Sequence, residues 1–135
     1  MIFLIDENIS WRLARMLDQF DQEHEVRALR DYFEAGTPDI EWMKVFASRK
    51  GDPVAVAGDG RILKNKVERQ ALKECALMFV CLAPGWMKLP WEVFAWKMVK
   101  AWPDIVRNAN DARQPTLFEV STHGKVRVLA RISNL

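Results

Sequence analysis

The stretch IFLIDEN at residues 2–8 decides the fold class, because it joins a continuous apolar run to an acidic turn. Such a run is typical of a strand buried on both faces, as in a parallel sheet. The pattern returns in PVAVAGDG at 53–60, and LMFVCL at 77–82 is a further apolar run. These three segments predict neighbouring buried strands.

Residues with helical spacing separate these runs. Leu13, Met16, Leu17 and Phe20 lie on one face of a predicted helix that Ser10 caps. The predicted elements are strands at 2–5, 24–29, 53–57 and 77–82, and helices at 11–20, from Thr37-Pro38 (with Thr37 as the cap) to about Lys50-Gly51, and at 66–76. Strands that alternate with helices predict an α/β fold, in which helices flank a mostly parallel central sheet.

The C-terminal part has a different pattern. A helix is expected from 90 to 102, stopped by Pro103, with a short helical turn at 104–111. The segments 117–121 and 126–132 flank a turn with glycine and predict a β-hairpin. The 135 residues fit one domain, with an α/β core at 1–102 and a C-terminal extension at 103–135.

The composition is that of a globular protein with little net charge. Charged residues make up 28% of the chain and the formal net charge is +2. The apolar start, residues 1–5, is too short for a signal peptide or a membrane span. Cys75 and Cys81 have neither disulfide-type nor zinc-type spacing, which favours a reducing compartment. We therefore expect a soluble, cytoplasmic protein.

Acidic residues follow two of the predicted strands. Asp6 ends the first run and Asp59 follows the run at 53–57, so parallel strands would bring both to one sheet edge. At about 100° per residue, Asp39 falls on the apolar face of its helix with Met43, whereas Glu41 falls on the opposite side. The sequence thus predicts a cluster of Asp6, Asp39 and Asp59.

Each aspartate taken alone has a simpler explanation. Asp39 could cap its helix, Asp59 could be a turn residue, and Asp6 could accept bonds from backbone amides. Together, the carboxylates would repel one another, and an oxygen-ligated cation such as Mg²⁺ or Mn²⁺ would relieve the repulsion. Such metals commonly serve phosphoryl chemistry. Arg61 and Lys64 could then hold a phosphate backbone.

Three segments resemble a known family: FLIDENIS at 3–10, GTPDIEWM at 36–43 and AGDGRILKN at 57–65. They look like the PIN-like fold of metal-dependent nucleases. The similarity is greatest to the reduced PIN-like group, which includes toxins of VapBC-type toxin–antitoxin systems. The resemblance covers about residues 1–100. It implies a cytoplasmic ribonuclease toxin with an RNA substrate and a cognate antitoxin.

The resemblance also implies roles for single residues. Asp6, Asp39 and Asp59 match the acids that hold Mg²⁺ or Mn²⁺ and catalyse cleavage. Glu7 and Asn8 match the run after the first acid, and Glu41 is a second choice because many relatives present a glutamate on this helix. Many relatives also carry an acid where this chain has Arg61, so a two-metal arrangement stays open.

Two other functions and one interaction surface stay open at this stage. A PIN-like module could bind RNA or protein without catalysis, as Arg61 would allow. A receiver-like domain could accept a phosphoryl group on Asp59. That class requires a lysine directly after the strand at 77–82, and here Ala83-Pro84 stands in that place. An antitoxin or a second copy of the chain could cover the helix at 90–102. Trp96 lies off the apolar stripe of this helix and Trp86 lies in the loop before it, so either could be exposed.

Overall fold

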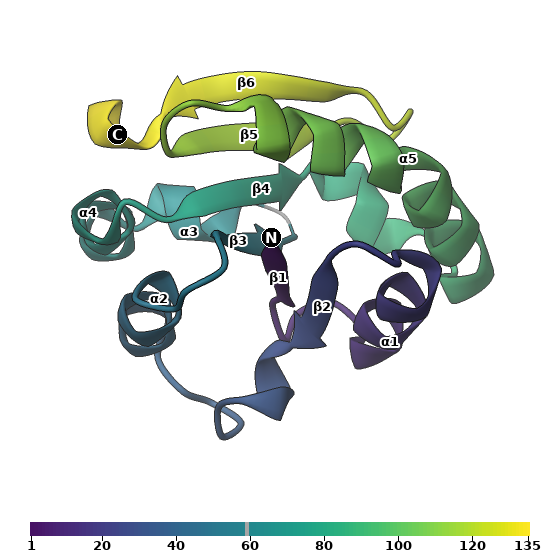
Figure 1. Cartoon of the computed structure of the whole chain (residues 1–135), viewed down its shortest axis with the longest axis horizontal. Helices are drawn as coiled ribbons and strands as arrows, with labels where there is room; N and C mark the ends of the chain where they lie inside the picture. The colour runs from purple at the N-terminus through teal and green to yellow at the C-terminus, as the bar shows by residue number, and fades with distance from the viewer. Residues whose placement is uncertain (59) are drawn as a thin grey trace.

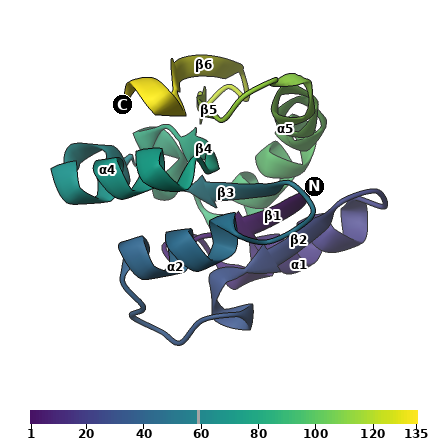
Figure 2. The same cartoon turned by 60° about the vertical axis from the view of Figure 1, so that its left-hand side comes forward.

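The computed structural model has one six-stranded sheet with helices on both faces (Figures 1 and 2). It describes residues 1–58 and 60–135. The strands are β1 (Ile2–Ile5), β2 (Glu25–Ala28), β3 (Pro53–Ala57), β4 (Met78–Leu82), β5 (Thr116–Val120) and β6 (Val126–Arg131). The α-helices are α1 (Trp11–Phe20), α2 (Asp39–Ala47), α3 (Arg61–Lys64), α4 (Lys66–Cys75) and α5 (Trp91–Asp111). Short 3₁₀ turns are η1 (Leu29–Asp31), η2 (Pro84–Lys88) and η3 (Ile132–Asn134).

The sheet has the order β2-β1-β3-β4-β5-β6. All neighbouring strands are parallel except β5 and β6, which form the antiparallel C-terminal hairpin. The predicted fold class, a mostly parallel sheet with a C-terminal hairpin, is therefore confirmed. Because β5 pairs with β4, the hairpin continues the central sheet. The division of the chain at residue 102 stays a prediction.

Two apolar layers explain why the strands are continuous apolar runs. On one face, Phe3 of β1 packs in the cluster that includes Leu13 of α1 and Trp102 of α5. On the other face, Leu4 packs in the cluster that includes Phe46 of α2 and Leu72 of α4. Figures 1 and 2 show α1 and α5 on one side of the sheet and α2 and α4 on the other. Alternate residues of one strand thus supply two separate cores.

The chain reverses its direction of travel across the sheet between β1 and β3. From β1 it moves outward to β2, then returns to place β3 on the other side of β1. Ile5 is in register with both Ala28 and Val56, so the carboxyl ends of these three strands are level. The Asp6 backbone N–H donates to the Val56 carbonyl at 2.9 Å. Ligands of open α/β sheets bind at such a reversal, beyond the carboxyl ends.

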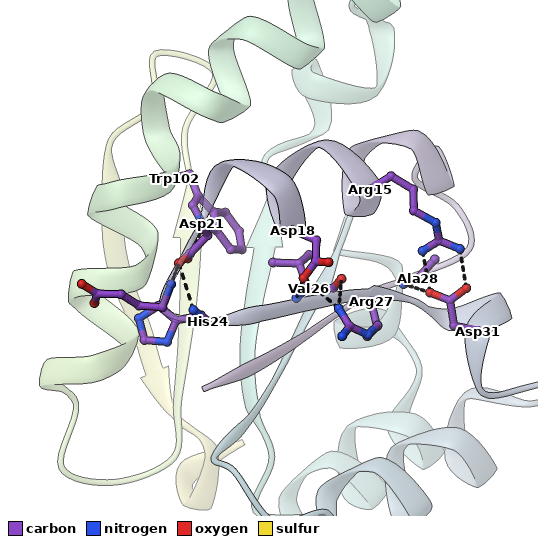
Figure 3. Close-up of polar contacts among 10 residues, drawn as sticks. Arg15, Asp18, Asp21, His24, Val26, Arg27, Ala28, Asp31 and Trp102 are labelled. Carbon is purple, nitrogen blue, oxygen red and sulfur yellow. Dashed lines mark hydrogen bonds and ion pairs between the residues drawn. The ribbon is translucent and has the colours of Figure 1, made fainter.

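Ion pairs and hydrogen bonds fasten α1 to β2 and to α5 (Figure 3). Arg15 of α1 donates to both carboxylate oxygens of Asp31 at 2.7 and 2.6 Å. Trp102 Nε1 donates to Asp21, at the end of α1, at 2.9 Å. The Arg15–Asp31 pair thus holds α1 to the segment after β2, and the Trp102–Asp21 bond holds the end of α1 to α5.

Several local predictions need correction. Ser10 caps α1 as expected, because its hydroxyl oxygen accepts a hydrogen bond from the Arg12 N–H at 3.2 Å. Thr37 does not cap α2: its hydroxyl donates to the Glu34 carbonyl at 2.6 Å, and Pro38 occupies the cap position. The helix ends at Ala47, before the expected stop at Lys50-Gly51.

Pro103 does not end the fifth helix, which runs through it to Asp111. An interior proline costs about 3 kcal/mol through a lost hydrogen bond and a steric clash. The residues that follow keep the apolar face in register, and Ile105 and Ala109 are buried against the sheet. Burial of that face offsets the cost of the proline. Within the described residues, α5 and every other helix are too short or too polar to cross a membrane.

Trp86, whose position in a loop left exposure possible, is fully buried. Its Nε1 donates to the carbonyls of Val120 and Ser121 at 3.1 and 2.8 Å. The end of β5 therefore supplies the polar partner that a buried indole needs. Trp96 of α5 is 56% exposed, as expected.

Candidate functional site

Asp6 lies immediately after β1, at the reversal of the sheet. Its carboxylate accepts a 2.7 Å hydrogen bond from the Glu7 backbone N–H. Burial and the negative charge of Asp39 raise the pKa of Asp6 from 3.8 to about 6, although the Glu7 N–H opposes the shift. A carboxyl group in this setting resists ionisation unless a positive charge is present.

Asp39 is the first residue of α2 and faces the carboxyl end of β1. The buried Trp42 Nε1 donates to Asp39 Oδ1 at 2.8 Å and fixes this carboxylate. Its charge acts on Asp6, whereas Glu41 is exposed. The structure thus brings Asp39 to Asp6 and leaves Glu41 in solvent. The helix N-terminus favours a negative charge at this position.

Glu68 is a further acid at this site, which the sequence analysis did not select. It is the third residue of α4, and α4 packs against α2. Burial, the charge of Asp39 and a side-chain hydrogen bond with Asp39 raise the pKa of Glu68. A signal was available: Glu68 shares the helix face of Ala71, Leu72 and Cys75, at helical spacing.

Arg61 lies near these acids. It is the first residue of α3, after Gly60 in the left-handed region with φ of 66°. Its positive charge acts on both Asp6 and Glu68 and opposes their raised pKa values. Lys64, at the other end of α3, is exposed. Arg61 therefore partly neutralises these acids.

The remaining predicted residues have different positions. Asn8 is exposed, and its Nδ2 donates to the Gly58 carbonyl at 3.5 Å, linking the loop after β1 to the loop after β3. Glu7 is exposed and contributes its backbone N–H to Asp6. Asp59, predicted as the third ligand, lies outside the described residues.

The described acids do not form a complete metal site. Among residues 1–58 and 60–135, no three histidine, cysteine, aspartate or glutamate side chains are arranged to hold a metal ion together. Asp6 and Asp39 nevertheless form a partly buried pair of like charges that supplies only oxygen ligands. Oxygen ligands suit Mg²⁺ and Mn²⁺ rather than zinc or copper.

The fold and these acids define a class of protein: an α/β domain with a carboxylate pair at the reversal point of its sheet. Residues 1–84 match the family described as "PIN like domain", and the chain therefore belongs to the PIN-like domain family. A PIN-like domain is a nuclease-type module that binds nucleic acid. Neither the curated proteins nor the solved structures contain a match to the chain. The family match favours the nuclease over the receiver-like alternative.

Proposed function

We propose that this protein is an endoribonuclease that depends on Mg²⁺ or Mn²⁺. The observation that supports the proposal most is the pairing of Asp6 with Asp39 at the carboxyl edge of a PIN-like domain. Two partly buried carboxylates held close together repel each other and destabilise the fold when no cation neutralises them. Such an arrangement is typical of a functional site. Asp59 follows the neighbouring strand and is proposed as the third metal ligand.

The roles of the side chains follow from their positions. Asp6 and Asp39 would hold the cation, and Trp42 keeps Asp39 in place through its indole N–H. A bound cation would lower the pKa of an attacking water and stabilise the charge that develops on the phosphate. Arg61 and Lys64 would contact the phosphate backbone beside the acids, and Asn8 would orient the substrate.

A catalytically silent RNA- or protein-binding module is the second candidate. Arg61 favours it, because this cation acts on Asp6 and Glu68 and competes with a metal for the same negative charge. In this case the acids and Arg61 would form a structural cluster, and RNA would bind without being cut.

The toxin role is a finer part of the proposal. An antitoxin would have to cover part of the surface, and α5 carries two tryptophans that are open to solvent. Trp96 is 56% exposed and Trp91 is 36% exposed. Exposed tryptophans are enriched among residues that dominate binding energy at protein interfaces. Replacement of Trp96 by alanine should weaken antitoxin binding, or self-association if the partner is a second copy; unchanged binding of both would argue against this surface.

RNA cleavage by matched variants tests the proposed function. Purified protein is incubated with labelled single-stranded RNA and Mn²⁺, beside Asp6→Asn, Asp39→Asn and Glu41→Gln. We expect cleavage by the wild type and by Glu41→Gln, and none by the two asparagine variants. Cleavage that survives Asp6→Asn would indicate another site or a contaminant. RNA binding without cleavage by any variant would support the silent module.

A further inference from the structure

A cleft of about 760 Å³ opens beside Asp6. One wall is the loop from β1 to α1, which includes Asn8, together with Trp11 at the start of α1. The other wall is the segment after β2, which includes Arg30 and Phe33. Clefts of about 300–1,000 Å³ suit small organic ligands, a range that includes a nucleotide. Asp6 is part of the lining, so a group bound in the cleft lies next to the candidate catalytic site.

Trp11, at the rim of this cleft, is an exposed aromatic residue with cationic neighbours. It is the first residue of α1 and is 40% exposed. The guanidinium groups of Arg12, Arg30 and Arg15 lie 5.1, 5.3 and 5.8 Å from the centre of its ring. Cation–π contacts at these distances hold the indole in position. The exposed part of the ring remains available as a stacking surface.

The three arginines around Trp11 differ in their charge balance. Arg15 forms a two-pronged ion pair with Asp31, drawn in Figure 3, so its charge is locally compensated. Within the described part of the chain, neither Arg12 nor Arg30 forms an ion pair. Their uncompensated charges flank an exposed indole. This combination matches the phosphates and bases of a single-stranded nucleic acid, whose bases stack on aromatic rings and arginine planes.

The wall formed after β2 carries a second aromatic residue with a cation. Tyr32 lines the cleft and is half-buried, and the guanidinium of Arg49 lies 4.2 Å from its ring centre. Arg49 itself lies outside the cleft lining, so this wall offers the cleft an aromatic ring, and Arg30 supplies its basic group. The charged residues of the lining are the acids Asp6, Glu7 and Glu34 and the base Arg30. The positive charge that would meet a phosphate therefore lies at the Trp11 end, where Arg30 and Arg12 flank the indole.

We propose that the cleft lined by Trp11 and Arg30 is a base-stacking subsite for single-stranded RNA. A base stacks on Trp11, Arg12 and Arg30 contact the flanking phosphates, and the adjoining phosphodiester reaches Asp6. The inference rests on the proposed ribonuclease function for its choice of RNA, but it concerns binding and is measured without cleavage.

Binding of a labelled single-stranded RNA, with Ca²⁺ or EDTA in place of Mn²⁺, tests the subsite. We expect Trp11→Ala to weaken binding by about 5- to 100-fold, the range found when one stacking aromatic is removed. Trp11→Phe keeps a ring and should retain most of the affinity. Phe20→Ala is the matched control, an exposed aromatic at the other end of α1, and should leave RNA binding unchanged.

Two further measurements separate stacking from general loss of charge or fold. Arg30→Ala should make the negative slope of log affinity against log salt shallower by about 0.7, as expected for one lost phosphate contact on a single strand. A duplex of the same sequence should bind more weakly, because its bases are already stacked. Circular dichroism checks that each variant remains folded.

The outcomes distinguish this inference from the proposed function. Equal RNA affinity of the wild type, Trp11→Ala and Arg30→Ala would overturn the subsite, even if Mn²⁺-dependent cleavage requires Asp6. Loss of binding in Trp11→Ala but not in Trp11→Phe would support the subsite, even if no variant cleaves RNA. Equal losses in Trp11→Ala and Phe20→Ala would also overturn it, because the effect would not belong to the cleft.

Discussion

Replacement of Asp6 by asparagine should stabilise the metal-free protein. Burial and the charge of Asp39 raise the pKa of Asp6 to about 6, above the value near 3.9 of an aspartate in an unfolded chain. At neutral pH, folding therefore forces a charged carboxylate into an unfavourable place. Asparagine removes the charge, and its oxygen can still accept the bond from the Glu7 N–H.

The size of the effect follows from the pKa. A rise from 3.8 to about 6 corresponds to about 3 kcal/mol of unfavourable free energy above pH 6. Asp6 is partly open to solvent, and the new amide group needs its own partners, so we expect a gain of about 1–2 kcal/mol. For a domain of this size, such a gain raises the melting temperature by about 3–8 °C.

Urea unfolding in EDTA, followed by tryptophan fluorescence, measures this difference. The folded state of the wild type binds more protons than the unfolded state between about pH 4 and 6, so its stability falls as the pH rises through that window. The variant should therefore gain most above pH 6 and little at about pH 4. Glu41→Gln, an exposed acid on α2, should change stability by less than about 0.5 kcal/mol. An Asp6→Asn variant that is destabilised at neutral pH, or equally stabilised at about pH 4, would refute the reasoning.

Three other perturbations have defined directions. Burial opposes the ionisation of Asp21, but hydrogen bonds from Trp102 Nε1 and two backbone N–H groups outweigh it and lower the pKa of Asp21. Asp21→Asn should therefore cost about 1 kcal/mol at neutral pH and progressively less as the pH falls through the folded-state pKa, measured by urea unfolding, and a constant difference would contradict this account. Arg61→Ala should increase Mn²⁺ affinity in calorimetry, because a competing cation is removed, and should decrease RNA affinity. If both affinities change in the same direction, Arg61 does not act on the metal and on the RNA as proposed. Since the pKa of Asp6 is about 6, Mn²⁺ affinity should fall by about tenfold per pH unit below that pH, and a flat profile would exclude Asp6 as a ligand.

The sequence was sufficient to predict the four parallel strands β1 to β4 and the approach of Asp39 to Asp6. It did not predict that β5 pairs with β4. Continuous apolar runs predict strands with two buried faces, and their parallel order places the strand ends at one edge. The position of Asp39 on the helix then follows from geometry, since the first turn of α2 faces that edge. Asp59 stays a prediction, as does the assignment of all three acids to a metal.

Features that depend on packing between distant segments were predicted less well. Pro103 remains helical because the apolar face continues on both sides of it, a tertiary effect that outweighs the local preference. Trp86 is buried because β5 supplies two carbonyl acceptors from residues 34 and 35 positions away. Glu68 joins Asp39 only because α4 packs on α2. In each case the deciding contact lies between elements whose relative placement the local pattern does not contain.

Direct Mn²⁺ binding tests the central claim, that Asp6 and Asp39 hold a divalent cation. The electron paramagnetic resonance signal of free Mn²⁺ is recorded during titration with the wild type, Asp6→Asn, Asp39→Asn and Glu41→Gln. The account predicts that the wild type and Glu41→Gln bind the ion, and that each asparagine variant binds it at least about tenfold more weakly. Equal Mn²⁺ binding by all four proteins, or loss of binding in Glu41→Gln alone, would contradict it.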